Sequence, residues 1–136
     1  MAQTERFLNV DNVDLIFGTF SSRLTFPMSS ALEQAEMAHP IPSGAALRIY
    51  LRGYETPFYF QQKAAEYVGE STINMIKGLV PEGEQPTSAA VVWADDFFAG
   101  SIANGLLGGV VEIEGEDDTY QLPPLIEDAG MEVVYQ

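Results

Sequence analysis

Clustered carboxylates are the side chains of this sequence that could most readily do chemistry. They form two groups, namely Asp95 and Asp96, and then Glu112, Glu114, Glu116, Asp117 and Asp118. Hard cations such as Ca²⁺ and Mg²⁺ bind where several carboxylate oxygens converge. The segment EGEDDT does not match the twelve-residue calcium loop, and adjacent acids at a hairpin tip usually point into water. We therefore expect a solvated acidic face that binds a protein partner, and no metal site.

The glycine-rich segment 100–109 resembles a phosphate-binding loop only in part. Four residues separate Gly100 from Gly105, but Leu106 stands where a P-loop requires Lys. No basic residue follows Lys77, and no GxGxxG spacing is present. The pattern excludes the known phosphate and dinucleotide loops.

The sequence lacks most of the residue combinations by which enzymes are recognised. His39 is the single histidine and there is no cysteine, which excludes multi-histidine and thiolate zinc sites, disulfides and thiol catalysis. No GxSxG elbow accompanies a Ser–His–Asp set. A glycosidase with paired carboxylates is compatible with the sequence, although no feature points to one. We expect a protein that is not an enzyme and that carries no cofactor.

Charge is distributed unevenly along the chain. The 136 residues carry a net charge of −14. Residues 1–77 hold all six bases and eight acids, whereas residues 78–136 hold twelve acids and no base. Such a field repels nucleic-acid backbones and anionic membranes, and attracts a basic protein surface. We expect no direct nucleic-acid binding and no membrane contact.

Periodicity predicts the elements of the first third of the chain. Residues 7–17 alternate in two registers, which predicts two short strands separated at Asp11-Asn12, and residues 24–26 are expected to return as a strand. Ser30 and Glu33 have the spacing of a capping box, which predicts a helix over about 31–38.

The middle of the chain is predicted to contain a hairpin and the main helix. Residues 47–52 (LRIYLR) alternate cleanly and indicate a strand, with residues 58–60 as its hairpin partner. Residues 61–78 carry apolar side chains at three- and four-residue steps, which indicates a helix.

The acidic third of the chain follows a loop at residues 81–88. It is predicted to contain a strand at 89–94, a hairpin over 110–120 and a last strand at 131–135. The expected fold is α+β, with a mainly antiparallel sheet and two helices (about 31–38 and 61–78), in a single domain over residues 1–136.

Two further sets of side chains are candidates for partner binding. Arg48, Tyr50, Arg52 and Tyr59 are expected to share the outer face of the predicted hairpin, because Arg and Tyr are common interface anchors. Phe97, Phe98, Leu106 and Leu107 form an apolar stretch, which is either a short buried helix or loop, or an exposed docking patch. The Arg-bearing strand of one copy would suit the acidic hairpin of another, which predicts self-association.

These observations favour a non-catalytic binding or assembly protein, such as a structural component of a phage or viral particle. One alternative is an acidic inhibitor that mimics nucleic acid and binds a basic enzyme. Another is a small cytosolic protein from a saline habitat, acidic for solubility alone. The N-terminal residues lack the pattern of a secretory signal, so the expected location is the cytoplasm or a particle assembled there.

Overall fold

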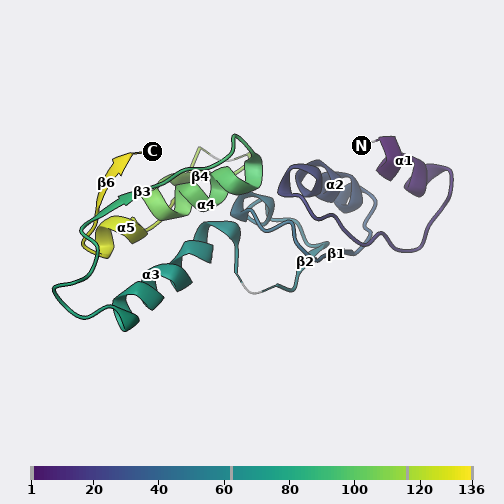
Figure 1. The fold of residues 1–136 in the computed structure, drawn as a ribbon. Coiled ribbons are helices and arrows are strands. Elements are labelled where there is room, and N and C mark those ends of the chain that lie inside the picture. Colours follow the sequence, from purple (N-terminus) through teal and green to yellow (C-terminus); the bar gives the residue numbers. More distant parts are fainter. Residues whose placement is uncertain (1, 62, 116, 136) are drawn as a thin grey trace.

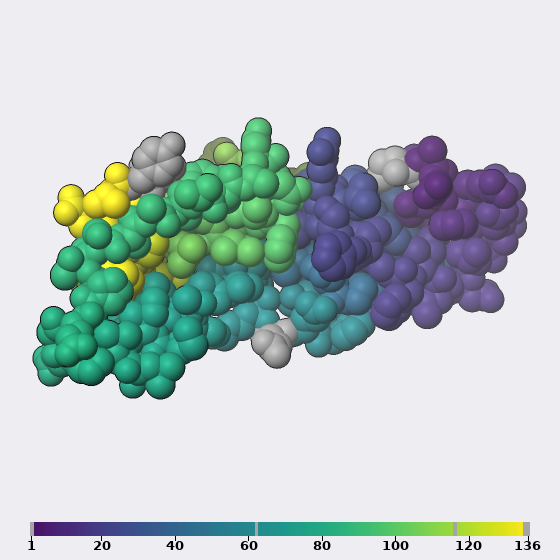
Figure 2. All heavy atoms as spheres, in the orientation of Figure 1, coloured from purple at the N-terminus to yellow at the C-terminus, as the bar shows by residue number. Residues whose placement is uncertain are grey.

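The computed structural model describes residues 2–61, 63–115 and 117–135. The chain is elongated, with its N-terminal and C-terminal elements at opposite ends (Figures 1 and 2). The N-terminal part contains α1 (Ala2–Asn9), α2 (Ser22–Gln34), β1 (His39–Ile41), the 3₁₀ turn η1 (Leu47–Ile49) and β2 (Pro57–Tyr59). The C-terminal part contains the 3₁₀ turn η2 (Ala65–Tyr67), α3 (Val68–Leu79), β3 (Ser88–Ala90), α4 (Phe97–Leu107), β4 (Val110–Glu112), β5 (Thr119–Gln121), α5 (Leu125–Asp128) and β6 (Glu132–Tyr135).

The strands pair mainly in parallel. Strand β1 runs parallel to β2, with Pro40 beside Phe58, and β3 runs parallel to β6. Only β4 and β5, within the described residues, form an antiparallel pair. The predicted α+β fold with a mainly antiparallel sheet and two helices is therefore wrong, because three two-stranded sheets and five α-helices make up the described chain. Parallel strands need a crossover connection, and α4 lies in the one between β3 and β6.

Helix α2 begins nine residues before the predicted start at residue 31. Its buried face consists largely of hydroxyl side chains, namely Ser22, Thr25 and Ser29, together with Met28 and Leu32. Thr25 donates a hydrogen bond back to the carbonyl of Ser21 at 2.9 Å, which satisfies its buried hydroxyl within the helix. The predicted strand at 24–26 is wrong, because these residues belong to α2. Hydrophobic periodicity could not reveal this helix, since its buried face is made largely of hydroxyl side chains.

The strands predicted within residues 7–17 and over 47–52 are wrong. Residues 2–9 form α1, the chain turns at Asn12, which has a positive φ of 48°, and residues 10–17 contain no strand. Residues 47–49 form η1, because the amide of Leu47 donates to the carboxylate of Glu66 instead of to a neighbouring strand. A six-residue alternating pattern fits a strand, but here a long-range hydrogen bond decides the conformation.

Several predicted elements are confirmed. The helix expected at 61–78 is present as η2 and α3, and a strand near 58–60 is present as β2, although the predicted hairpin with residues 47–52 is wrong because β2 pairs in parallel with β1. The predicted hairpin over 110–120 is β4–β5, and the last strand is β6. The glycine-rich segment after residue 96 forms α4, whose first turn is capped by the carboxylate of Asp96.

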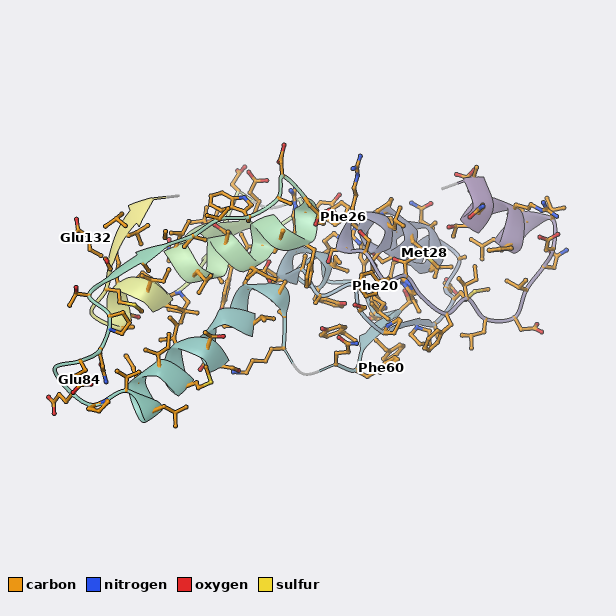
Figure 3. All side chains as sticks on the ribbon, in the orientation of Figure 1. Phe20, Phe26, Met28, Phe60, Glu84 and Glu132 are labelled. Atoms are coloured by element: carbon orange, nitrogen blue, oxygen red, sulfur yellow. The ribbon has the colours of Figure 1, made fainter. Side chains whose placement is uncertain are left out.

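Three clusters of buried side chains stabilise the chain. One lies under α2 (Ile16, Met28, Leu32), one under α4 (Ile73, Val91, Ala103, Ile126, Met131), and one at the junction of the two parts (Ile41, Ala46, Ile49). At this junction the ring of Phe26 on α2 meets the ring of Phe97 on α4 edge to face at 5.7 Å. The side-chain view in Figure 3 places Phe26 between these helices.

Candidate functional site

The loop of residues 43–47 lies at the junction and is fixed from both sides. On the N-terminal side, the amide of Ala46 donates to the buried hydroxyl of Ser22 at 3.2 Å. On the C-terminal side, the amide of Ala65 donates to the carbonyl of Ala45 at 2.8 Å, and the amide of Leu47 donates to Glu66. The loop therefore joins the two parts through backbone hydrogen bonds.

The carboxyl group of Glu66 has an unusual environment for an acid. Glu66 is 2% exposed, and the amide of Leu47 contacts both of its oxygens, at 3.1 and 2.9 Å. Burial raises the pKa of Glu66, while hydrogen bonds from its own amide, from Leu47 and from Ser101 act in the opposite direction. Glu66 serves as the acceptor that places the loop.

An open groove of about 760 Å³ adjoins this loop. Its lining comes from both parts of the chain and combines hydroxyl, amide and ammonium groups with aromatic and aliphatic side chains: Ser43, Ala45, Tyr59, Gln61, Lys63, Val68, Ser71, Thr72 and Phe98. Small-molecule sites of this size combine apolar contacts with polar groups that orient the ligand, and in this groove the polar side chains outnumber the apolar Ala45, Val68 and Phe98. The groove has the chemistry to hold a small, partly apolar and partly polar molecule.

The tyrosines beside the groove are held in their neutral form. Burial raises the pKa of Tyr59 above its usual value near 10. Burial, followed by the influence of Tyr59, raises the pKa of Tyr50 much further. The two rings lie 5.4 Å apart, and the hydroxyl of Tyr50 donates to the carbonyl of Gly44. Neutral phenols at this position can donate hydrogen bonds but carry no charge.

The basic residue of the groove is already paired. Lys63 Nζ lies 2.5 Å from a carboxylate oxygen of Glu70, and both side chains are partly exposed. The backbone carbonyl of Lys63 also accepts a hydrogen bond from the hydroxyl of Tyr59 at 3.1 Å. The groove is thus close to electrically neutral, which suits an uncharged or zwitterionic molecule better than an anion.

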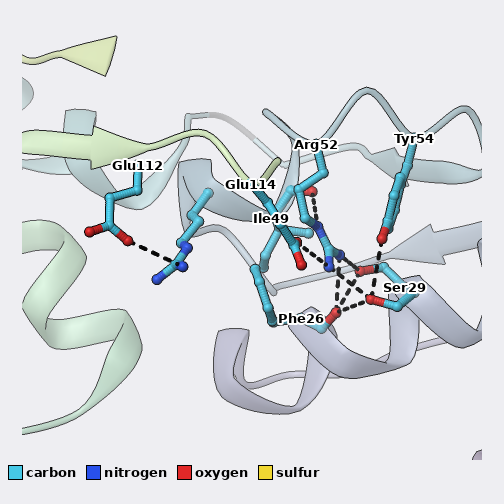
Figure 4. A network of polar contacts seen from close by, with 9 residues as sticks. Phe26, Ser29, Ile49, Arg52, Tyr54, Glu112 and Glu114 are labelled. Atoms are coloured by element: carbon cyan, nitrogen blue, oxygen red, sulfur yellow. Dashed lines mark hydrogen bonds and ion pairs between the residues drawn. The ribbon is translucent and has the colours of Figure 1, made fainter. Parts of the chain in front are cut away.

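The predicted acidic face is divided among separate roles. Asp95 is exposed, whereas Asp96 accepts hydrogen bonds from two amides of the first turn of α4. Glu112 pairs with Arg48 and Glu114 pairs with Arg52, each at 3.3 Å (Figure 4). Asp117 and Asp118 are exposed on the hairpin, and Glu116 lies outside the described residues. The pairing that the sequence suggested between copies occurs here within one chain.

The predicted Arg/Tyr face does not exist as one surface, because residues 47–52 are not a strand. The side chain of Arg52 is 1% exposed and lies between the rings of Phe26 and Tyr54. Tyr50 is hydrogen bonded to the loop, and Tyr59 lines the groove. The side chain of Arg48 is 40% exposed, and its guanidinium reaches Glu112.

The predicted apolar stretch forms α4 and is half-buried. Leu106 and Leu107 pack against the cluster that contains Ile73 and Ile126, whereas Phe98 faces the groove. Sequence reasoning identified Tyr59 and Phe98 but missed the other residues of the groove. Serines and threonines at loop ends and helix starts carry no distinctive spacing, and only their convergence in space singles them out.

Metal binding and membrane spanning receive no support from the described residues. Within residues 2–61, 63–115 and 117–135, no three His, Cys, Asp or Glu side chains are grouped so as to hold an ion. His39 is buried, and burial lowers its pKa although its Nε2 contacts the carbonyl of Gly18. In the same ranges, none of the helices has both the length and the apolar character of a bilayer span.

Comparison with known proteins identifies the fold but not a family. No family model matches the chain. The structure resembles an ABC transporter substrate-binding protein from Desulfitobacterium hafniense with a TM-score of 0.70 and 13% sequence identity. It also resembles a crystal structure of such a protein from the same organism in complex with Leu, with a TM-score of 0.71 and 13% identity. Each match covers 98% of this chain and 33% of the other, so the chain spans about a third of the length of those structures.

Proposed function

We propose that this chain binds a small organic molecule, of the size and polarity of an amino acid, in the groove beside residues 43–47. The observation that carries the proposal is the composition of the groove, which is lined from both parts of the chain and mixes apolar with hydrogen-bonding groups. The likeness to substrate-binding proteins, one of them in complex with Leu, supports the same class of ligand. Binding without chemical conversion is the proposed activity.

Leucine fits the groove on chemical grounds. Its aliphatic side chain would contact Val68 and Phe98, while its polar groups would meet the hydroxyls of Ser43, Ser71 and Thr72. A zwitterion also suits a groove whose one lysine is already paired with Glu70. Removing one hydrogen-bonding partner from a bound polar group typically costs about 1 kcal/mol or more, which is roughly a fivefold loss of affinity.

The experiment is titration calorimetry of the chain with L-leucine, followed by a panel of the other amino acids. We expect saturable binding that weakens at least severalfold in Ser43→Ala and Thr72→Ala. Thr119→Ala is the matched control, because Thr119 is an exposed residue of β5 outside the groove lining. Absence of binding by every amino acid, or equal effects of all three variants, would refute the proposal.

A second function, the binding of a protein partner or assembly into a larger particle, is favoured by the amount of exposed surface. A folded monomer of this mass would expose roughly 7,000 Å², whereas this chain exposes 8469 Å². Part of the surplus is an apolar face beside β2, where Leu15, Phe17, Phe58 and Phe60 are 55%, 63%, 55% and 59% exposed. Parallel sheets are normally covered on both faces, whereas Phe58 of β2 and Phe60 beside it are largely exposed here.

Sedimentation velocity over a range of protein concentrations tests this second function. We expect association that is abolished by the double change Phe58→Ser and Phe60→Ser. Leu79→Ser, at a position on α3 that is more exposed than either phenylalanine (76%), should leave association unchanged. High salt should strengthen an apolar contact between chains of like net charge, whereas a contact of acidic residues with a basic protein or enzyme would weaken. A chain that remains monomeric at every concentration and captures no partner would remove this second function.

A further inference from the structure

The β4–β5 hairpin reaches from the C-terminal part to the N-terminal part of the chain. It emerges between α4 and α5, yet two of its carboxylates meet arginines on and beside η1. Glu112 Oε2 lies 3.3 Å from a guanidinium nitrogen of Arg48, and Glu114 Oε2 lies 3.3 Å from Nη1 of Arg52. Figure 4 shows the carboxylates of Glu112 and Glu114 with dashed lines to their arginine partners, of which Arg52 is labelled.

Arg52 is the fixed member of this contact. Its guanidinium donates to Ser30 Oγ at 2.8 Å and to the carbonyl of Phe26 at 3.0 Å, and it also contacts Ser29 Oγ. The ring centroids of Phe26 and Tyr54 lie 4.1 and 4.3 Å from its central carbon. Because Arg52 is 1% exposed and Glu114 is 48% exposed, the glutamate is the member that can leave.

The distribution of charge along the described chain leaves the hairpin carboxylates with cationic partners only across the junction. No Lys or Arg follows Lys77, so a carboxylate of the hairpin has no cation on its own side of the junction downstream of α3. The cations that the hairpin carboxylates contact are Arg48 of η1 and Arg52, three residues beyond the end of η1. The ion pairs therefore hold the hairpin across the junction and not along its own sheet.

The contact adjoins the proposed binding groove through η1. Residues 43–47 lead directly into η1, and Tyr50, which follows η1, donates to the carbonyl of Gly44 in that loop. The chain itself crosses from one part to the other between β2 and η2. The hairpin supplies a further link at a separate point of the junction.

We propose that the β4–β5 hairpin is an electrostatic strap that restrains the two parts of the chain and so regulates the opening of the groove. Its effect on ligand binding rests on the proposed small-molecule function, whereas its effect on the arrangement of the two parts does not. The strap releases when the carboxylates of Glu112 and Glu114 are replaced by amides or when salt screens the pairs, since screening is substantial for partly exposed ions. Release opens the groove and weakens ligand retention.

The restraint is measured first, without ligand. The chain has no cysteine, so Glu55→Cys and Glu84→Cys allow two spin labels to be placed, one in each part. We expect the distance distribution between the labels to broaden towards longer values in Glu112→Gln with Glu114→Gln, and in the parent chain at about 1 M salt, where the Debye length is about 3 Å.

The matched control is Asp117→Asn with Glu127→Gln. It removes the same charge from exposed carboxylates for which no ion pair is formed among the described residues. An unchanged distribution in the Glu112/Glu114 variant, or an equal change in the control, would overturn the strap. Circular dichroism of each variant verifies that the exposed substitutions leave the fold intact.

The second readout is the affinity for L-leucine. The carboxylates of both pairs are exposed, although the guanidinium of Arg52 is not, and the loss of two such pairs should raise the dissociation constant roughly two- to thirtyfold. If leucine binds neither parent nor variant while the distances change, the groove proposal fails and the strap stands. If leucine binds with the same affinity in both although the distances change, the regulatory part of the proposal is wrong.

Discussion

Replacement of Gly105 by Ala provides the sharpest test of how α4 packs against η2 within the C-terminal part of the chain. Gly105 lies in α4, where the helix packs directly against η2. A Cβ at this position would lie 1.7 Å from the carbonyl oxygen of Glu66, and 2.4 and 2.6 Å from its carbonyl carbon and Cα. All three atoms belong to the backbone, so no side-chain rotation can relieve the clash.

The magnitude follows from these distances. Ordinary contacts of a Cβ are about 3.4–4 Å, so α4 and η2 would have to separate by more than an ångström. Overpacking usually costs about 1–3 kcal/mol, and a clash with backbone belongs at the upper end or beyond. The intrinsic gain of Ala over Gly in a helix, about 1 kcal/mol, offsets only part of this cost. We expect a net destabilisation of roughly 2 kcal/mol or more.

Urea unfolding, followed by circular dichroism and by the fluorescence of the single tryptophan Trp93, measures the effect. Gly100→Ala is the matched control within the same helix, because a Cβ at Gly100 would meet no atom within 4 Å. That variant should be more stable than the parent by up to about 1 kcal/mol. If Gly105→Ala were as stable as Gly100→Ala, the close approach of α4 to η2 would be refuted.

The remaining predictions concern single carboxylates. Hydrogen bonds from the hydroxyl and amide of Thr56 and from the amide of Glu55 lower the pKa of Glu33 below 4.5. The stabilisation from Glu33 is therefore present above pH 4.5 and is lost as the pH falls through the lowered pKa. Glu33→Gln should flatten the acid limb of a plot of stability against pH, and an unchanged limb would contradict the assignment. The pH dependence of stability due to Glu66 has the opposite sign, because burial raises its pKa. The stability of the chain should decline as the pH rises from 4.5 through the raised pKa of Glu66. Glu66→Gln should remove that decline in the same series of unfolding measurements. Asp96→Ala removes the cap of α4, whose Oδ1 accepts amides at 2.9 and 3.2 Å, and should cost about 1 kcal/mol in thermal unfolding; no loss would show that the cap is dispensable.

Local patterns predicted the elements whose signals do not depend on distant partners. Helix α3 was recognisable because apolar residues recur at three- and four-residue steps, although its buried residues are Gly69 and Ile73, whereas Val68 and Leu79 of the predicted series are exposed. The β4–β5 hairpin was recognisable because Val111 points inward while Glu112 faces solvent, around a turn of glycine and acids. These features follow from side-chain hydrophobicity at fixed spacing, which the sequence displays directly.

Other elements were invisible to such patterns for physical reasons. The buried face of α2 uses the hydroxyls of Ser22, Thr25 and Ser29, which satisfy themselves on backbone groups and Arg52. The alternation in residues 47–52 was outweighed when Glu66 accepted the amide of Leu47. A strand signal such as that of residues 57–59 also does not specify its partner, and the partner turned out to be the parallel β1.

The candidate groove depended still more on tertiary structure. Its lining comes from segments as far apart as Ser43 and Phe98, and none of these residues belongs to a motif. The partner-binding roles predicted for the acidic, apolar and arginine-bearing residues stay predictions. The structure shows, however, that Arg52 and Glu114 form an ion pair within one chain, whereas the sequence suggested such a pairing between copies.

Composition and order of residues alone determined the charge asymmetry, the lack of cysteine chemistry, the absence of recognisable phosphate loops and the locally encoded α3 and hairpin. Tertiary structure alone decided that strands pair mainly in parallel, that the buried face of α2 carries hydroxyl residues, and that the acidic hairpin contacts arginines on and beside η1. The reason is that spacing along the chain reports local conformational preference, whereas the choice of a distant partner depends on which buried donors, acceptors and charges can satisfy one another in the folded chain.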